Sequence, residues 1–362
     1  MYWYYKYPLI VILLAILFGI GYNIYKRLPD DMLSQTEEES GEPQSGEQQD
    51  GDNGSKQEQR EKSEDGREAE PNGQERDSTG REEESDNSDG KPRFRPGEGW
   101  DVASELDLPE LTAKQLKAAR EQLDNDNFHA ARRLAYEILN QATVERFSAT
   151  WYKAAIIVSE ANTEIINSDI PVPEKERYEV RQGDALGKIA RKFNTTIGAL
   201  IRGNAEIDSD RATIYPGTTL SIYRGDWSIV VDKEEFLLLL MDGDKLFKVY
   251  PTALGKGGRT PVGTFVISTK LREPAWTPPG RVIPYGDPEN ILGTRWLGLT
   301  PTGETDQALT GYGIHGTWEP DSIGSNASRG CIRLINEDVE ELYDIIPRGV
   351  KVTIKDGGER YE

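Results

Sequence analysis

Apolar side chains alternate with long polar segments along the chain, and their spacing changes from one segment to the next. Residues 8–25 form an almost unbroken apolar run that, as a helix, would extend roughly 27 Å, enough to cross a hydrocarbon core. From residue 30 to residue 100 apolar side chains almost disappear. Beyond residue 111 they return, first at helical spacing and then also in short strand-like runs. The pattern predicts a hydrophobic N-terminal segment, a polar linker and a folded remainder.

The apolar run 8–25 predicts a membrane anchor. Aromatic residues precede it, as in an interfacial belt, and Lys26 and Arg27 follow it. A cleaved signal peptide is the alternative, but the run is long and no small-x-small cleavage site follows it. Lys6 and the N-terminus balance the two basic residues on the other side, so these charges do not fix the orientation. We predict an uncleaved anchor whose orientation rests on the downstream modules.

The segment 30–100 is rich in Glu, Asp, Ser, Gly and Gln, and it carries most of the chain's formal net charge of −20. Such a composition cannot bury enough apolar surface to offset its chain entropy. The segment is therefore predicted to be a disordered, self-repelling acidic linker. Binding of divalent cations or basic partners is an alternative, but a solvated spacer is favoured. We expect no nucleic-acid partner.

Residues 111–166 predict a helical region. Apolar side chains recur there at helical spacing in three stretches, and the polar run 124–127 separates the first two. The antiparallel hairpin, with Ala at tight packing positions, resembles one tetratricopeptide unit, but a solenoid needs about three. We interpret the region as a small helical spacer or docking module.

Residues 178–222 predict a small βααβ unit, in which Asp184 is placed to cap one helix and Thr196 a second. This segment resembles the LysM module, which binds glycans that contain N-acetylglucosamine, such as peptidoglycan. The family has Thr where Ala185 stands, so one hydroxyl contact is expected to be missing. The resemblance places the glycan between residues 208–214 and the loop after the first strand, whose residues are Gly183, Asp184, Ala185 and Leu186.

Residues 227–356 predict a β-rich domain. The Asp-Gly-Asp sequence at 242–244 is typical of a hairpin. A proline-rich excursion between Leu271 and Asn290 is typical of a lid or binding loop. Asn336 is placed to cap a short helix that would buttress the preceding turn. Strand-like runs occupy residues 228–232, 235–241, 246–252, 264–267 and 350–354.

Cys331 is the only cysteine of the chain, and His315 and His129 are its only histidines. A thiol with an ordinary pKa near 8.5 is a poor nucleophile at neutral pH, and a nearby imidazole activates it. Gly316 and Gly330 beside the pair let the backbone approach a reacting group. His129 lies in a polar helical stretch and is interpreted as a surface residue. A lone Cys or His is most often structural, but the combined pattern favours a cysteine–histidine enzyme.

This pattern resembles the L,D-transpeptidases with the YkuD-type catalytic domain. Their signature is His-Gly followed by Ser-(His/Arg)-Gly-Cys-(Ile/Val)-Arg, and it is matched here by His315-Gly316 and by residues 328–333. Many members have His where Arg329 stands, so a proton relay through a second histidine is excluded at this position. The resemblance covers roughly residues 227–356, with further matching stretches at 255–256, 260–265 and 292–299.

The resemblance implies a reaction and a role for each residue. Cys331 would attack the carbonyl at the L-centre of the third stem-peptide residue, usually a diamino acid. This step expels the terminal D-Ala and leaves a thioester that an acceptor amine resolves. His315 would be the general base and acid, oriented by the backbone carbonyl of Gly316. The residues implied for the oxyanion are Arg329, Gly330 and Cys331, and those implied for substrate binding are Arg333, Tyr312 and Ser328.

The prediction is a multidomain peptidoglycan L,D-transpeptidase of the bacterial cytoplasmic membrane, single-pass, with its catalytic region facing the periplasm or cell wall. Its expected partners are the membrane and the stem peptides and glycan strands of peptidoglycan. No cofactor is expected, and one Cys and two His leave little for a transition-metal site. One alternative is an L,D-carboxypeptidase, in which water resolves the thioester in the same site. Another is a non-catalytic tether that holds the wall through LysM.

Overall fold

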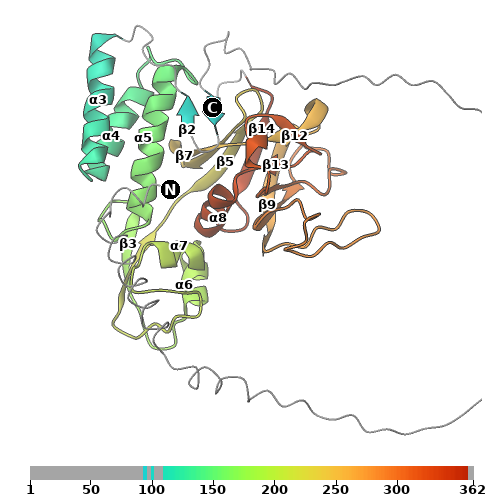
Figure 1. Cartoon of the computed structure of the whole chain (residues 1–362). Coiled ribbons are helices and arrows are strands. Elements are labelled where there is room, and N and C mark those ends of the chain that lie inside the picture. Colours follow the sequence, from blue (N-terminus) through green and yellow to red (C-terminus); the bar gives the residue numbers. More distant parts are fainter. Residues whose placement is uncertain (1–92, 96–98, 102–108, 358–362) are drawn as a thin grey trace, which may run out of the picture. The chain divides into compact units, whose positions relative to one another are not determined.

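The computed structural model describes residues 93–95, 99–101 and 109–357 (Figure 1). The chain divides into two units, residues 1–81 and 82–362, and all described residues belong to the second. The apolar run 8–25 and nearly all of the acidic segment 30–100 therefore lie outside the described residues.

The structure contradicts the predicted localisation as a single-pass protein of the cytoplasmic membrane. Within residues 93–357, as far as they are described, no helix is long and apolar enough to cross a membrane. The longest helix among the described residues, α5 (Ala149–Ile166), has 18 residues. It carries Lys153, Glu160 and Glu164, and it packs Trp151 and neighbouring residues against the catalytic sheet. This helix is a buried element of a folded domain.

A sheet of eight strands forms the catalytic domain, in the order β13-β11-β10-β9-β14-β5-β6-β7. Neighbouring strands are antiparallel except for the pairs β11–β13 and β14–β5, which are parallel. A second, two-stranded sheet pairs β8 (Leu254–Gly255) with β12 (Asn326–Ser328). The bounds of the large sheet are β5 Trp227–Asp232, β6 Leu237–Asp242, β7 Lys245–Pro251, β9 Gly263–Arg272, β10 Arg295–Pro301, β11 Gly313–His315, β13 Ile332–Arg333 and β14 Lys351–Lys355.

The β-rich fold predicted for this domain is confirmed, and its core explains why. Alternate residues of the central strands point inward and pack with the apolar face of α8 (Asn336–Ile345), as expected for a sheet covered by an amphipathic helix. The Asp-Gly-Asp turn at 242–244 joins β6 to β7, as predicted. Fully buried members of the core include Phe247, Phe265, Ile229, Leu297 and Leu342.

Three helices form the region predicted at 111–166: α3 (Glu110–Asp124), α4 (Phe128–Leu139) and α5. Helix α5 lies on the sheet, where buried Asn162 donates to the Phe247 carbonyl at 2.9 Å. Residues 93–95 and 99–101 add a small hairpin, β1 and β2, at the end of the segment predicted to be disordered. The Trp100 ring, 5.1 Å from that of Tyr152, accounts for this difference because it gives the hairpin an apolar contact.

The LysM segment folds as the predicted βααβ unit, with β3 (Lys175–Glu179), α6 (Leu186–Lys192), α7 (Ile197–Arg202) and β4 (Thr219–Tyr223). Strands β3 and β4 are antiparallel neighbours. Thr196 caps α7 as predicted, accepting from the Ala199 amide at 2.8 Å. Asp184 does not cap α6. Its carboxylate instead accepts from the Arg181 amide at 2.9 Å and from the Tyr178 hydroxyl at 2.7 Å.

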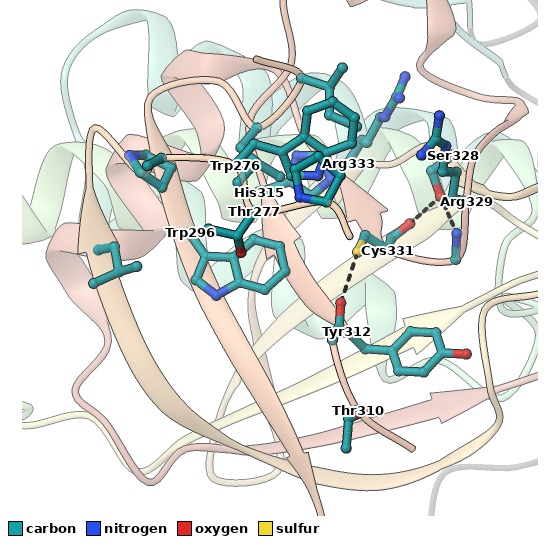
Figure 2. A pocket seen from close by; sticks show the side chains of 18 of the residues that line it. Trp276, Thr277, Trp296, Thr310, Tyr312, His315, Ser328, Arg329, Cys331 and Arg333 are labelled. Carbon is teal, nitrogen blue, oxygen red and sulfur yellow. Dashed lines mark hydrogen bonds between the residues drawn. The ribbon is translucent and has the colours of Figure 1, made fainter. Parts of the chain in front are cut away.

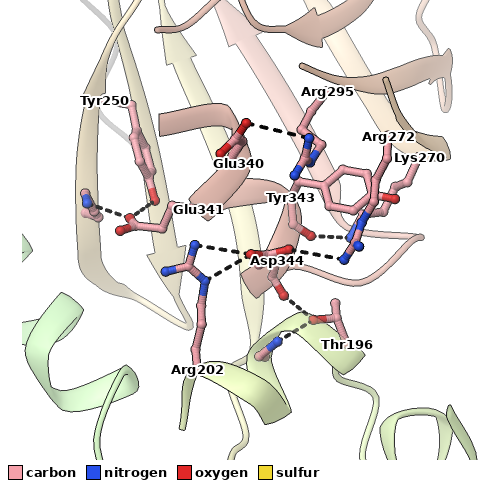
Figure 3. Close-up of polar contacts among 12 residues, drawn as sticks. Thr196, Arg202, Tyr250, Lys270, Arg272, Arg295, Glu340, Glu341, Tyr343 and Asp344 are labelled. Atoms are coloured by element: carbon pink, nitrogen blue, oxygen red, sulfur yellow. Dashed lines mark hydrogen bonds and ion pairs between the residues drawn. The ribbon is translucent and has the colours of Figure 1, made fainter. Parts of the chain in front are cut away.

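LysM contacts the catalytic domain where α7 meets the C-terminal end of α8 (Figure 3). The carboxylate of Asp344 accepts from the Arg202 side chain at 3.2 Å, and the Thr196 hydroxyl donates to the Asp344 backbone carbonyl. Arg272 of β9 lies 3.8 Å from the same carboxylate. A Cβ on Gly198 would lie 2.7 Å from that of Asp344, so only glycine allows this close approach. We call this contact the LysM–α8 interface.

Candidate active site

His315 ends strand β11 and is buried, with 2% of its surface exposed. Its Nδ1 lies 2.6 Å from the Gly316 carbonyl oxygen, which can only accept, so Nδ1 carries the proton. Burial lowers the pKa of His315 to about 4, the charge of Arg333 acts in the same direction, and the bond to Gly316 opposes both. At neutral pH the imidazole is therefore uncharged, and the lone pair on Nε2 is available as a base.

Cys331 immediately precedes strand β13 and is partly buried. Burial raises the pKa of its thiol, against the opposing influence of a hydrogen bond from the Gly313 backbone and of the Arg333 charge. The thiol donates to the Gly311 carbonyl at 3.7 Å, a bond drawn in Figure 2. In this state the sulfur is therefore a neutral thiol, and it needs a base when it reacts.

The sheet topology brings these two residues together. Strands β11 and β13 pair in parallel, with Ile314 opposite Ile332 and His315 opposite Arg333. Both reactive side chains consequently line one pocket of about 470 Å³ (Figure 2). The indole of Trp296 on β10 stacks beside the imidazole, with ring centroids 5.9 Å apart. This geometry suits nucleophilic catalysis in which the imidazole deprotonates the thiol as substrate arrives.

The turn from Ser328 to Cys331 is held by one buried hydroxyl. Ser328 accepts from the Gly330 amide at 3.0 Å and donates to the Cys331 carbonyl at 2.6 Å. Gly330 has a φ of +142°, and a Cβ there would lie 2.9 Å from the Tyr312 ring, so the position requires glycine. The hydroxyl of Ser328 and the amide of Gly330 thus bond to each other and shape the turn.

Thr260, which lies in the matching stretch 260–265 but was assigned no role there, is a second support of this turn. Its hydroxyl donates to the Gly330 carbonyl at 3.0 Å and accepts from the Gly255 amide at 2.8 Å. Thr260 is only 1% exposed. The sequence does not reveal this role of Thr260, because the hydrogen-bond partner Gly330 lies 70 residues away.

The predicted substrate-binding residues Arg333 and Tyr312 both line the pocket. The Arg333 guanidinium pairs with Glu319 at 2.9 Å. Its Nε is buried and has no hydrogen-bond partner within the described residues. Since an unsatisfied buried donor is costly, this atom is suited to meet a substrate acceptor. Tyr312 lies between the pocket and the turn that carries Cys331.

The proline-rich excursion forms one wall of the pocket, as its composition predicted for a binding loop. Trp276 and Ile283 exchange two backbone hydrogen bonds of 2.8 Å and so close a small ring in the loop. Buried Asn290 fastens the base of the ring by donating to the carbonyls of Pro274 at 2.9 Å and Pro284 at 3.1 Å. The loop is thus an ordered wall.

The predicted glycan-binding residues lie in LysM and do not line this pocket. Gly183 has a φ of +83° in the turn before α6, where Asp184 makes the bonds described above. Leu186 is buried in the LysM core. Over the described ranges, no cluster of three or more His, Cys, Asp or Glu side chains is arranged to hold a metal ion.

Comparison with known proteins matches two families to the chain. The L,D-transpeptidase catalytic domain matches residues 226–354, and the LysM domain matches residues 178–222. The YkuD protein of Bacillus subtilis strain 168, which bears the L,D-transpeptidase name, is 36% identical over 182 residues, 49% of this chain and 97% of that protein. The YcfS protein of Escherichia coli K12, with the same family name, is 31% identical over 188 residues, 48% of this chain and 59% of that protein.

Among solved structures, the L,D-transpeptidase from Mycobacterium smegmatis is 23% identical. The match covers 38% of this chain and 63% of that one, with a TM-score of 0.29.

The β-rich domain and its cysteine–histidine pocket define an enzyme of the cysteine acyltransferase class. The chain belongs to the L,D-transpeptidase family, since it covers almost the whole of a relative that is 36% identical. It is an L,D-transpeptidase that also contains a LysM domain, and both domains imply peptidoglycan as the partner. The alternative of an idle catalytic fold that serves only as a wall tether is thereby set aside.

Proposed function

We propose that this enzyme cleaves the bond between the L-centre of the third stem residue and the terminal D-Ala, and transfers the acyl group to an amine. The observation that supports this most directly is the pairing of a neutral, Nδ1-protonated His315 with the Cys331 thiol in one pocket. In this proposal residues 227–356 carry out the chemistry. Residues 178–222 bind the glycan through Gly183, Asp184 and Ala185 together with residues 208–214.

The proposed acylation begins with proton transfer from the Cys331 thiol to Nε2 of His315, as the sulfur attacks the substrate carbonyl carbon. The resulting oxyanion is stabilised by backbone amides of the turn. We assign this role to the amides of Arg329 and Cys331, because the Gly330 amide already donates to Ser328. Collapse of the tetrahedral intermediate breaks the C–N bond, and the imidazolium protonates the departing D-Ala amine. A thioester on Cys331 remains.

Deacylation reverses these roles. His315 takes a proton from the acceptor amine as its nitrogen attacks the thioester carbon, and the thiolate leaves and is reprotonated by the imidazolium. The product contains a new amide bond. If water attacks in place of the amine, the product is a tripeptide acid and the enzyme is an L,D-carboxypeptidase.

Incubation of the full chain with disaccharide-tetrapeptide muropeptides, followed by mass analysis, tests the proposal. Cross-linked dimers that have lost one D-Ala are the expected product, and the Cys331→Ala variant is the control that should form none. Tripeptide monomers alone would establish the carboxypeptidase instead. Unchanged tetrapeptide would refute the proposed substrate.

A further inference from the structure

The charge of the catalytic pocket is opposite in sign to that of the chain. The whole sequence carries a formal net charge of −20, yet the residues that line the pocket include two arginines, Arg329 and Arg333, and no Asp or Glu. A cleft lined by one sign of charge concentrates ligands of the other sign. The pocket is therefore suited to a substrate that presents negative charge near the reacting carbonyl.

The two arginines differ in how their charge is used. Arg333 is buried, and its guanidinium is paired with Glu319 at 2.9 Å. Arg329 is exposed, and no carboxylate within the described ranges forms an ion pair with it. Its guanidinium lies over the Trp276 ring, 5.5 Å from the centroid. Arg329 thus supplies a charge to the pocket that the rest of the described chain does not neutralise.

The position over the Trp276 ring also limits where this guanidinium can go. The Trp276 backbone is fixed by its two hydrogen bonds to Ile283, so the ring belongs to the ordered wall of the pocket. A guanidinium held over an aromatic face still has N–H groups that the ring does not engage, and these are available to a ligand. A planar carboxylate is the group that matches this fork with two parallel hydrogen bonds.

We infer that Arg329 binds the free α-carboxylate of the amino acid that leaves the donor peptide, and so selects donors that end one residue after the cleaved bond. This inference rests on the proposed function, in which the leaving residue is the terminal D-Ala. Arg329 precedes Cys331 by two residues, and consecutive Cα atoms are about 3.8 Å apart. In a one-residue leaving group only about three bonds separate the attacked carbonyl carbon from the carboxylate carbon, so the inference places this carboxylate in the same pocket as Arg329 and Cys331.

The selection has a clear chemical consequence. A donor with one further residue has an amide where the shorter donor has its carboxylate, and an amide does not neutralise the guanidinium. The kcat/KM for a tetrapeptide donor would then exceed that for a pentapeptide donor about 10- to 100-fold, because the pentapeptide lacks one charge-assisted pair of hydrogen bonds. Arg329 is in this view a specificity-determining residue for the donor.

The test compares two donors that differ only at this group: a tetrapeptide with a free C-terminal carboxylate and the same tetrapeptide as its C-terminal carboxamide. For the full-length enzyme, kcat/KM should favour the acid about 10- to 100-fold. In the Arg329→Gln variant the two donors should have kcat/KM values within about threefold of each other. Arg329→Lys should restore part of the preference for the acid, because Lys keeps the positive charge but lacks the planar guanidinium with its two parallel N–H donors.

Arg281→Gln is the matched control. Arg281 is an exposed arginine of the same proline-rich loop, but it pairs with Glu289 at 2.7 Å and does not line the pocket. Its removal should leave the ratio of acid to amide as in the unchanged enzyme.

Each other outcome overturns the inference in a distinguishable way. If the unchanged enzyme uses acid and amide equally, the enzyme is an L,D-transpeptidase of the proposed kind, but Arg329 does not read the carboxylate. If Arg329→Gln lowers both donors by the same factor, Arg329 acts only by holding the Trp276 wall. If neither donor is cleaved at all, the proposed function itself fails.

Discussion

The catalytic pocket and the LysM–α8 interface lie on the same domain, but they are built from different interactions. In the pocket, His315 is 2% exposed and its Nδ1 is oriented by the backbone carbonyl of Gly316, and burial is the main influence on the pKa of both reactive groups. At the interface, Asp344 meets Arg202 and Arg272, whose side chains remain 25% and 46% exposed. Removal of one reactive atom from the pocket should therefore greatly lower activity. Each partly exposed ion pair at the interface, by contrast, contributes little to stability.

The largest effect that this contrast predicts is at the nucleophile. Replacing Cys331 by Ala removes the atom that forms the acyl bond, so turnover of muropeptides should fall by about 10⁴-fold or more. Acylation by carbapenem-type β-lactams, expected from the family resemblance to use the same thiol, should disappear with it. Intact-protein mass spectrometry checks the adduct. A covalent adduct on the Ala variant would show that another residue is the nucleophile.

A second prediction concerns the pH dependence that burial of His315 imposes. The imidazole works as a base only when it is neutral, and its pKa is lowered to about 4. As the pH falls from 8 to 5, kcat/KM should stay nearly constant, and it should fall only as the pH approaches about 4. A pH–rate profile on a soluble muropeptide measures this. An acid limb near the ordinary pKa of about 6.5 would mean that the imidazole is solvated in the working enzyme.

A third prediction concerns Asn336, the first residue of α8, which lies against Gly316. Its Oδ1 accepts from the Thr294 amide at 3.1 Å and packs against Gly316, whose carbonyl orients His315. Asn336→Ala should lower kcat on a soluble muropeptide about tenfold with little change in KM, because the base loses its orientation while the pocket wall remains.

Asn336→Asp is the control for this position because it keeps the oxygen acceptor and adds charge at a helix N-terminus, where an anion is favourable. It should recover most of the activity. If Ala and Asp lower kcat equally while both variants unfold at the temperature of the unchanged protein, the acceptor oxygen is not what positions His315.

The sequence predicted what depends on local pattern and missed what depends on distant partners. The hairpin at 242–244 and the alternating strands β5 and β14 follow from turn chemistry and a period of two. Strand β10 was not predicted as a strand, since its glycine and short apolar run give a weak signal.

Two residues that were wrongly predicted to cap helices show why the remaining contacts could not be predicted from the sequence. Asp184 and Asn336 both stand where a side chain commonly caps the following helix, and both were assigned that role. In the structure Asp184 accepts from Arg181 and Tyr178, and Asn336 accepts from Thr294, which is 42 residues away in sequence. A polar side chain near a helix start is visible in the sequence, but the partner that it finds in the fold is not.

The smallest expected effect is at the LysM–α8 interface. Asp344→Ala removes both ion pairs but leaves the backbone carbonyl that accepts from Thr196. If LysM only raises the local concentration of enzyme on peptidoglycan, the variant's rate on soluble muropeptides should stay within about two- to threefold of that of the unchanged enzyme. Its rate on insoluble peptidoglycan should fall more, because the two modules lose their fixed orientation. Gly198→Val, whose side chain would overlap Asp344, should give the same result by steric separation. A collapse of kcat on the soluble substrate, in a variant that is still folded by circular dichroism, would contradict this. It would mean that the contact of LysM with Asp344 affects the position of Asn336 at the other end of α8, and through Asn336 the orientation of His315.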